Sequence, residues 1–309
     1  MARPIELTLA HSPDADDMAM WWPLTGMRDP EGELVEPPAI ETGRFAFRPM
    51  AEDVEALNAS AGDAELDITA ISAAAWPALA DRYAITDCGA SFGEGYGPKV
   101  VVPADAPVRT IEQLRKTRAI IVPGLRTTAA LVLRLLLGEA RERVSLEARP
   151  FQQVAPAVLA GAADGGVLIH EAQLAFEGMG LRMVVDLGAW WHDQTGAPLP
   201  LGLNVIRRGL EAEHGGGTLA EVSRLLSASV THARAHPDAT RRYLLMHADA
   251  RPEWRDAALL NRYLAMYVSD LTASMGGAGR DALALLYREA AAADLFRGVV
   301  DRLPTVDVA

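Results

Sequence analysis

The stretch Gly165-Gly166-Val167-Leu168-Ile169-His170-Glu171-Ala172-Gln173-Leu174 determines the fold that we predict for this chain. Gly-Gly opens it, and the three apolar residues that follow, two of them β-branched, predict a buried strand. From Glu171 onward the residues are typical of the start of a helix. His170 is therefore expected at the carboxyl end of a strand, the edge at which open α/β sheets bind ligands. The alternative for a lone histidine after an apolar strand is a core residue that is hydrogen-bonded to backbone.

Length, composition and charge limit the classes of function. The chain has 309 residues, half of them hydrophobic, which suffices for two domains of ordinary size. Its formal charge of −12 and its sequence pI of about 5.1 argue against binding to nucleic acid or to anionic membrane surfaces. A small anionic ligand would need local donors to overcome the net negative field. The single cysteine, Cys88, excludes an intramolecular disulfide and a cysteine metal cluster, and we expect it to be a small buried residue.

The amino terminus shows no targeting pattern. It enters a strand pattern at Ile5 without a preceding apolar signal-peptide region. No apolar run in the chain is long enough to span a bilayer. We therefore expect a cytoplasmic protein that has no membrane partner.

Two further stretches predict a strand that runs into a helix and ends at a serine. Residues 5–10 alternate as a strand, and Ser12 before Pro13 is typical of a helix N-cap followed by proline at the first helical position. Residues 65–71 predict a strand that ends at Ser72, where the next helix begins. Both serines are therefore expected at the ligand-binding edge of a sheet.

A third such stretch places two threonines at the start of a helix. Residues 118–122 predict a strand, and Thr127 and Thr128 precede a strongly helical run. Unpaired backbone N–H groups at a helix N-terminus favour an anion. The alternative interpretation, a threonine that only caps the helix, explains one of the two residues but not obviously both.

Three other motifs are expected to be structural. The glycine-rich residues 89–98 are not a dinucleotide-binding fingerprint, because a strand and not a helix follows them. We expect these glycines to allow close backbone approach where the chain crosses between lobes. Residues 25–44 are rich in proline, glycine and acidic residues and predict an extended loop. His232 and His236 have a zinc-ligand spacing, but the glutamate of a metalloprotease helix is missing, so a solvated helix face is expected.

The order of the predicted elements indicates an α/β protein of two lobes, similar to the type II periplasmic-binding-protein fold, with a cleft between the lobes. Strands and helices alternate both before and after the glycine-rich segment, and helical patterns alone follow residue 217. We expect the first lobe to comprise 1–103 plus 204–309, with the helical tail, and the second, inserted lobe to comprise 104–203. Two crossings rich in glycine and proline, at 97–103 and 198–204, would form the hinge.

The polar residues at the strand ends are predicted to converge on that cleft. Two junctions come from each lobe, and they carry Ser12, Ser72, Thr127, Thr128 and His170. This set suits a small polar or carboxylated ligand that is held by helix N-termini. The lone titratable base among them indicates chemistry as well as binding.

Several motifs together resemble the 1,4-dihydroxy-6-naphthoate synthase family, in the same order over the first two-thirds of the chain. They are Ser12-Pro13-Asp14-Ala15-Asp16-Asp17, Glu52-Asp53-Val54-Glu55-Ala56-Leu57-Asn58, Thr69-Ala70-Ile71-Ser72, Gly89-Ala90-Ser91 with Gly95-Tyr96-Gly97-Pro98, Val122-Pro123-Gly124 with Thr127-Thr128, Ile169-His170-Glu171, and Asp186-Leu187-Gly188-Ala189-Trp190-Trp191 through Leu199-Pro200-Leu201-Gly202. The chain departs from the family in residues 25–44, where a short hairpin is usual, and in Trp21-Trp22, which replaces a phenylalanine-tyrosine type pair.

The resemblance implies a lyase of the futalosine route to menaquinone, which converts cyclic de-hypoxanthine futalosine into 1,4-dihydroxy-6-naphthoate by breaking a carbon–carbon bond. It implies His170 as the proton acceptor and implies no cofactor and no metal. The residues that it implies for substrate contact are Ala70, Ile71, Ser72, Thr127 and Thr128. Further candidates within the same motifs are Ser12, Asp14, Asn58 and Gly97.

Two other functions stay open. Chorismate dehydratase of the same pathway shares the fold, although the Ile-His-Glu and Asp-Leu-Gly-x-Trp-Trp stretches favour the synthase. A non-catalytic solute-binding protein for a small carboxylate is the second alternative, and the lack of a signal peptide argues against it. Turnover of a substrate would distinguish an enzyme from this binding protein.

Overall fold

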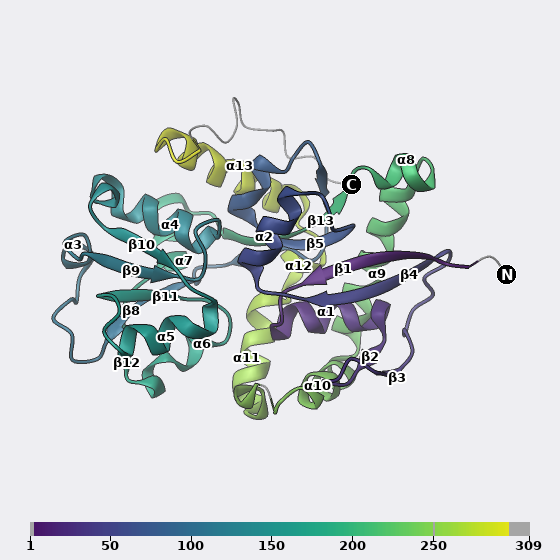
Figure 1. Cartoon of the computed structure of the whole chain (residues 1–309), viewed down its shortest axis with the longest axis horizontal. Helices are drawn as coiled ribbons and strands as arrows, with labels where there is room; N and C mark the ends of the chain where they lie inside the picture. Colours follow the sequence, from purple (N-terminus) through teal and green to yellow (C-terminus); the bar gives the residue numbers. More distant parts are fainter. Residues whose placement is uncertain (1–2, 250, 297–309) are drawn as a thin grey trace.

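The computed structural model describes residues 3–249 and 251–296, and it consists of two α/β lobes side by side (Figure 1). Each lobe is built around a twisted sheet with helices packed against it, as predicted. The chain enters the second lobe once and returns to the first. The two-lobed fold expected from the order of elements is thereby confirmed.

The first lobe contains a sheet in the order β4-β1-β5-β13-β6, with β7 also paired to β13. Its strands are β1 (Ile5–His11), β4 (Phe45–Ala51), β5 (Ile68–Ser72), β6 (Tyr83–Ile85), β7 (Ser91–Gly93) and β13 (Leu199–Arg207). Strand β1 runs parallel to β4 and β5, whereas β13 runs antiparallel to β5, β6 and β7. The carboxyl ends of β1 and β5 therefore meet at one edge of this sheet.

The second lobe contains a sheet in the order β10-β9-β11-β8-β12. Its strands are β8 (Lys99–Pro103), β9 (Ala119–Val122), β10 (Ser145–Ala148), β11 (Gly165–Leu168) and β12 (Leu181–Asp186). Its helices are α3 (Ile111–Leu114), α4 (Thr128–Leu137), η2 (Gly138–Glu142), α5 (Phe151–Leu159), α6 (Ala172–Ala175), η3 (Phe176–Met179) and α7 (Leu187–Thr195). Strands β9, β10 and β11 are parallel, and β8 is antiparallel to both of its neighbours.

The sheets divide the chain slightly earlier than the expected boundaries at 103/104 and 203/204. Strand β8 pairs with β11 and β12, so it belongs to the second lobe together with its first residue, Lys99. Strand β13 pairs only within the first sheet among the described residues, so the return to the first lobe is complete at Leu199. The glycine and proline content marked both crossings, but it does not show where the hydrogen-bonded ladder begins within them.

The helices of the first lobe include a long carboxyl-terminal series. They are α1 (Ala15–Thr25), α2 (Val54–Gly62), η1 (Ala73–Ala78), α8 (Leu210–His214), α9 (Thr218–Ala235), α10 (Pro237–Met246), η4 (Pro252–Arg255), α11 (Ala257–Tyr267), α12 (Asp270–Ala273) and α13 (Gly276–Ala292). Helix α1 is buried along its whole length, packed against α9, α10 and α11. Among the described residues the tail after residue 217 is helical without a strand, as expected, and residues 250 and 297–309 lie outside that description.

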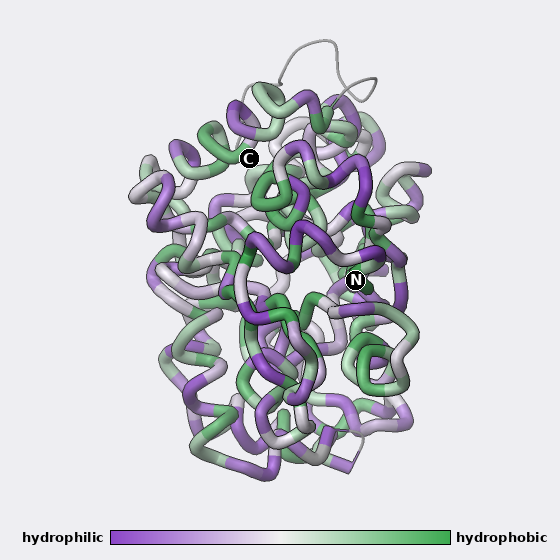
Figure 2. The backbone as a smooth tube through the Cα atoms, turned by 90° about the vertical axis from the view of Figure 1, so that its left-hand side faces the viewer, coloured by the Kyte–Doolittle hydropathy of each residue, from purple (hydrophilic) through white to green (hydrophobic). Residues whose placement is uncertain are grey.

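The hydrophobic core follows the amphipathic pattern of the elements. Figure 2, which views the molecule from the side of the second lobe, shows hydrophobic and hydrophilic segments alternating along the tube, as expected of helices that bury one face. Trp21 and Trp22 are buried in the core, and so is Cys88. In the part of the chain that the structure describes, no helix combines the length and apolarity needed to cross a membrane.

Glycines are required where elements approach closely. A Cβ on Gly166 of β11 would lie 2.7 Å from side-chain atoms of Val154 and Val158, so glycine lets α5 pack directly on the sheet. A Cβ on Gly188 would lie 1.9 Å from the carbonyl oxygen of Tyr96 at the crossing between the lobes. The predicted close backbone approach at this crossing is thereby confirmed, with Gly97 packed against Gly188.

Some local predictions were wrong. Asp14, not Ser12, is the N-cap of α1, and its side chain accepts a hydrogen bond from the backbone N–H of Asp17. Residues 25–44 are not only a loop, because β2 (Met27–Arg28) and β3 (Leu34–Glu36) pair there as a short antiparallel ladder. The expected solvated face at His232 and His236 agrees with the structure, in which His236 is exposed, His232 is half-buried and the two rings stack at 4.0 Å between centroids.

Candidate active site

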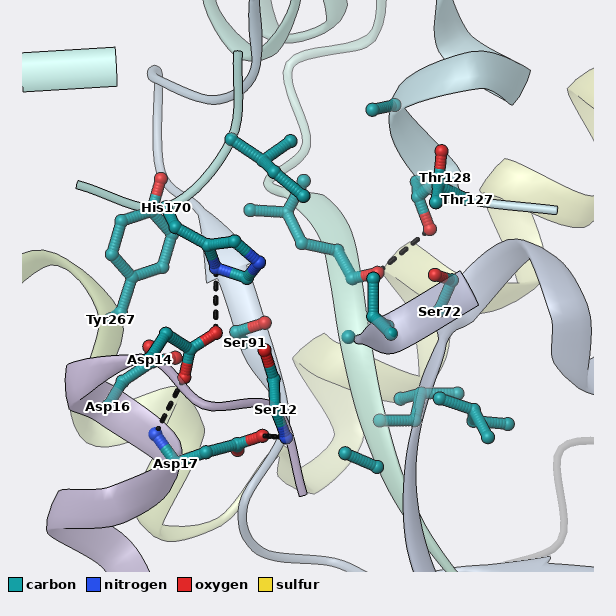
Figure 3. A pocket seen from close by; sticks show the side chains of 18 of the residues that line it. Ser12, Asp14, Asp16, Asp17, Ser72, Ser91, Thr127, Thr128, His170 and Tyr267 are labelled. Carbon is teal, nitrogen blue, oxygen red and sulfur yellow. Dashed lines mark hydrogen bonds and ion pairs between the residues drawn. The ribbon is translucent and has the colours of Figure 1, made fainter. Parts of the chain in front are cut away.

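A cavity lies between the two lobes, and most of the predicted site residues line it (Figure 3). The empty space among its lining residues, together with the solvent at its mouth, is about 730 Å³. The predicted residues that line it are Ser12, Asp14, Ala70, Ile71, Ser72, Thr127, Thr128 and His170. Asn58 and Gly97 are not among the lining residues.

His170 is held at the cavity by a carboxylate from the other lobe. Its Nδ1 atom lies 2.7 Å from Oδ2 of Asp14, and both side chains are largely buried, with exposed fractions of 14% and 4%. The Nε2 atom of His170 is buried without a hydrogen-bond partner among the described residues. An ionised carboxylate can only accept, so Nδ1 carries the hydrogen and Nε2 of the neutral ring is an acceptor.

The backbone of His170 is in the left-handed region, with φ of +54°. This conformation is uncommon for residues other than glycine and occurs frequently at functional sites. His170 lies two residues after the end of β11, where the chain turns toward α6, and its ring makes an edge contact with Phe151 at 4.5 Å between centroids. The turn and the ring contact together fix the direction of the imidazole.

The pair of His170 and Asp14 shifts both pKa values toward the charged forms. Burial of the ring would lower the pKa of His170, but the charge and hydrogen bond of Asp14 raise it above its ordinary value. Burial would likewise raise the pKa of the Asp14 carboxyl, but the charge and hydrogen bond of His170 hold it well below its ordinary value. Asp14 is therefore the ionised member of the acidic cluster.

The pKa values of the two neighbouring carboxyls, those of Asp16 and Asp17, shift in the opposite direction. Burial and the charges of Asp14 and Asp17 raise the pKa of Asp16 well above its ordinary value, and burial and the charge of Asp14 do the same for Asp17. Asp16 accepts a hydrogen bond from the Tyr263 hydroxyl at 2.8 Å, and Asp17 accepts one from the backbone N–H of Ser12 at 2.7 Å. These residues support the first turn of α1 while Asp14 carries the charge.

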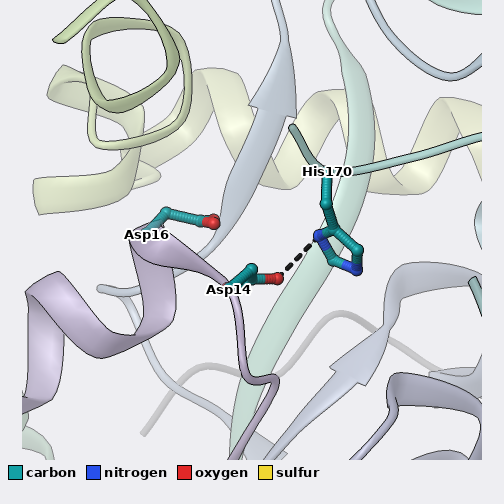
Figure 4. A group of neighbouring side chains, drawn as sticks. All are labelled: Asp14, Asp16 and His170. Carbon is teal, nitrogen blue, oxygen red and sulfur yellow. Dashed lines mark ion pairs between the residues drawn. The ribbon is translucent and has the colours of Figure 1, made fainter. Parts of the chain in front are cut away.

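Asp14, Asp16 and His170 also have a spacing that could accommodate a metal ion (Figure 4). One ligand atom from each lies within 4.8 Å of the others. The hydrogen bond between His170 and Asp14 and the one from Tyr263 to Asp16 account for this arrangement through pairing within the protein. The geometry of the three side chains therefore needs no metal to explain it.

Ser72 is positioned by Asn58 at the end of β5. The amide nitrogen of Asn58 donates to Oγ of Ser72 at 3.0 Å, and its Oδ1 accepts from the backbone N–H of Ser72 at 2.8 Å. Asn58 is buried on α2, behind the strand end. It thus supports a cavity residue from outside the cavity.

The hydroxyls of Thr127 and Thr128 have different hydrogen-bond partners at the start of α4. Thr127 is the N-cap, whose Oγ1 accepts from the backbone N–H of Ala130 and donates to the carbonyl of Gly124. Thr128 donates its hydroxyl to the carbonyl of Leu201 at 2.8 Å and accepts from the backbone N–H of Ala74 at 3.1 Å. Their hydroxyls are therefore used within the protein. In the first helical turn the backbone N–H of Ala130 is bonded to Thr127, whereas those of Thr128 and Ala129 lack intrahelical partners and are available to an anion.

Glu171 follows His170 in the chain, but its side chain contacts other residues of the first lobe. Its Oε1 accepts from the backbone N–H of Ala15 at 3.1 Å and from Nε1 of Trp254 at 2.7 Å, both in the first lobe. Burial, and secondarily the charge of Asp14, raises the pKa of this carboxyl. Glu171 therefore links the second lobe to the first.

The cavity also contains polar residues that the sequence did not single out as site residues. They are Asp16, Asp17, Ser91, Gln173, Asn204, Tyr263 and Tyr267. Gln173 lies one helical turn after His170, a spacing that could have indicated it. Asn204 lies in the crossing rich in proline, where no periodicity distinguishes it. The two tyrosines are four residues apart on α11, but the sequence does not show which face of that helix meets the cavity.

Comparison with known proteins gives consistent results. A family model described as menaquinone biosynthesis matches residues 7–292. The 1,4-dihydroxy-6-naphthoate synthase of Thermus thermophilus is 35% identical over 94% of this chain and 95% of its own length, and that of Streptomyces coelicolor is 33% identical over 94% of both chains.

Solved structures agree with the fold. A crystal structure of a protein from Archaeoglobus fulgidus has a TM-score of 0.78 at 36% identity and covers 94% of this chain and 98% of its own. The alkanesulfonate-binding protein SsuA of Xanthomonas axonopodis has a TM-score of 0.63 at 13% identity, covering 100% and 97%, and shares the periplasmic-binding-protein-like fold. The chain thus belongs to the menaquinone biosynthesis family, in which its curated relatives are 1,4-dihydroxy-6-naphthoate synthases.

Proposed function

We propose that this protein is a 1,4-dihydroxy-6-naphthoate synthase, a carbon–carbon lyase that converts cyclic de-hypoxanthine futalosine in the menaquinone pathway. The observation that carries the proposal is the pair of His170 and Asp14 across the cleft, which leaves Nε2 of His170 as a buried acceptor at the cavity. The names of the relatives support the same reaction. A binding protein that only retains its ligand has no need of an oriented base.

In this proposal His170 is the general base. Its Nε2 removes a proton from the sugar-derived part of the substrate, which opens that ring and allows the fragment to leave. Asp14 holds Nδ1–H, selects the tautomer and stabilises the imidazolium that forms. The charge that develops on the ring meets an ionised carboxylate that is already in place, so little reorganisation is needed.

The carboxylate of the substrate is assigned to the opposite end of the cavity. Figure 3 shows Ser72, Thr127 and Thr128 on the side away from His170 and Asp14. The first turn of α4 offers backbone N–H groups and the positive end of the helix dipole there. This local field favours an anionic substrate in spite of the net charge of −12.

Incubation with cyclic de-hypoxanthine futalosine tests the proposal. We expect mass spectrometry to detect 1,4-dihydroxy-6-naphthoate, and we expect the His170→Asn variant to form little of it. A parallel incubation with chorismate tests the dehydratase alternative. Dehydration of chorismate without formation of naphthoate would reject the proposal, and binding of the futalosine derivative without any product would instead indicate a solute-binding protein.

A further inference from the structure

One buried hydrogen-bond acceptor at the cavity, Oδ1 of Asn204, has no role in the proposed reaction. Asn204 of β13 is 2% exposed and lines the cavity, and its Oδ1 has no hydrogen-bond partner in residues 3–249 and 251–296. A buried amide oxygen without a donor is unfavourable and needs an explanation. A donor on the substrate would remove this cost when the ligand binds.

The orientation of the Asn204 amide is determined by its other end. Its Nδ2 donates to the carbonyl oxygen of Gly89 at 2.8 Å. A carbonyl can only accept, so the NH₂ group must face Gly89 and Oδ1 must take the other position. Gly89 has φ of +78°, and a Cβ there would lie 2.7 Å from Nδ2 of Asn204 and 2.9 Å from the ring of Trp21. The amide is therefore held firmly in one orientation.

The strands around Asn204 leave space for a ligand. In the antiparallel pairing of β5 and β13, Asn204 is opposite Ala70 and Gly202 is opposite Ser72. Opposed residues of an antiparallel pair share a face, as do residues two apart along a strand, so these four residues share one face of the sheet. All four line the cavity. Asn204 is the large polar side chain on a floor that otherwise consists of small residues.

We propose that Oδ1 of Asn204 accepts a hydrogen bond from a hydroxyl of the sugar-derived part of the substrate and so contributes to substrate specificity. This inference rests on the proposed function, which supplies a substrate that bears such hydroxyls. An acceptor that cannot donate selects a hydroxyl over a carboxylate, because a carboxylate oxygen would be repelled. The carboxylate therefore belongs at the first turn of α4 and the hydroxyl-bearing ring on the floor at Asn204.

Gln173 offers a similar amide, but its orientation is less constrained. Its Nε2 lies 2.6 Å from the hydroxyl of Tyr267, a group that can both donate and accept. Either orientation of this amide therefore satisfies its partner. The specificity role is assigned to Asn204 because only there does the protein determine which atom is free.

Calorimetric titration of the full chain carrying His170→Asn tests the inference, because this variant lacks the proposed base and should consume the ligand far more slowly than the wild type. The ligands are cyclic de-hypoxanthine futalosine and its analogues in which one sugar hydroxyl at a time is replaced by hydrogen. We expect one analogue to bind at least about tenfold more weakly than the full substrate, the loss of one hydrogen bond to a buried acceptor. Adding Asn204→Ala should weaken binding of the full substrate and remove the difference between the two ligands.

Asn261→Ala is the matched control. Asn261 lies on α11 away from the cavity, where its Oδ1 accepts from Arg241, and its replacement should leave all affinities unchanged. If Asn204 is intact and the substrate and every deoxy analogue bind equally well, the inference is overturned. The proposed function would still stand, and a bound water would then be the donor to Oδ1 of Asn204. Failure of the wild type to bind or convert the substrate would reject the proposed function, and the inference with it.

Discussion

Nδ1 of His170 and Oδ2 of Asp14 lie 2.7 Å apart although the two residues belong to different lobes and are separated by more than 150 positions in the chain. His170 and Asp14 therefore come together only where the lobes meet. Glu171, next to His170, makes its own contacts with the first lobe through Ala15 and Trp254. Assembly of this pair, which we propose to be catalytic, therefore requires the two lobes to be in contact.

Replacement of Asp14 by Asn should separate binding from chemistry. An amide in this position no longer selects the Nδ1–H tautomer or stabilises the imidazolium, so kcat should fall by roughly 10²–10⁴. Affinity for the substrate should change much less. Steady-state kinetics with calorimetric binding measures both quantities, and an unchanged kcat would show that Asp14 does not orient the base.

The pH dependence of kcat/KM should report the raised pKa of His170. The base must be neutral, so activity falls as pH decreases through its pKa, and the acidic limb should lie above the ordinary value of about 6.5. In Asp14→Asn the raising charge is lost while burial remains, so the limb should move to lower pH. A limb at the same pH in both proteins would contradict the assignment.

The same pKa shift has a consequence for stability. A raised folded-state pKa stabilises the protein fully below the unfolded value of about 6.5, and this contribution is lost as pH rises through the folded pKa. Urea unfolding of the wild type should therefore show a decrease in the free energy of unfolding above pH 6.5 that His170→Asn lacks. Parallel pH profiles for the two proteins would argue against this coupling.

Glu171→Ala should destabilise the fold. It removes the acceptor of two buried donors, the backbone N–H of Ala15 and the indole N–H of Trp254. At about 1–3 kcal/mol for each unpaired donor, the free energy of unfolding should fall by roughly 2–6 kcal/mol. Glu171→Gln keeps an oxygen acceptor and should lose less than half as much. Equal stability of the alanine variant and the wild type in urea would disprove the role as a link between lobes.

Thr128→Val tests the other end of the cavity. The substitution removes a hydroxyl that joins Ala74 and Leu201 beside the first turn of α4. We expect kcat/KM to fall tenfold or more, on the order of 1.4 kcal/mol, because the anion site shifts relative to the first lobe. Thr127→Ser, which retains the capping hydroxyl, is the control and should remain close to the wild type. A Val variant with unchanged kcat/KM would remove Thr128 from the site.

The sequence predicted the elements that depend on local patterns. The apolar run before His170, the strand that ends at Ser72 and the helix that starts after Thr127 all follow from periodicity and capping. The convergence of these strand ends on one cleft follows from the order of elements in an α/β fold.

Long-range pairing could not be predicted in the same way. Ser12 and Asp14 are both good N-caps, and only the packing of α1 beneath the cleft selects Asp14. That Asp14 also contacts His170 depends on how the lobes meet, which no local pattern encodes. Asn204 was missed for the same reason, because its importance arises from strand register and from Gly89, a residue far away in the sequence.

The most direct test of His170 as the general base is the turnover of the His170→Asn variant at saturating cyclic de-hypoxanthine futalosine, measured together with its affinity for the same compound. Removal of the general base should reduce kcat by roughly 10²–10⁴ while the affinity stays close to that of the wild type. Near-wild-type turnover by a variant that still binds the substrate would show that another residue takes the proton and would contradict the account.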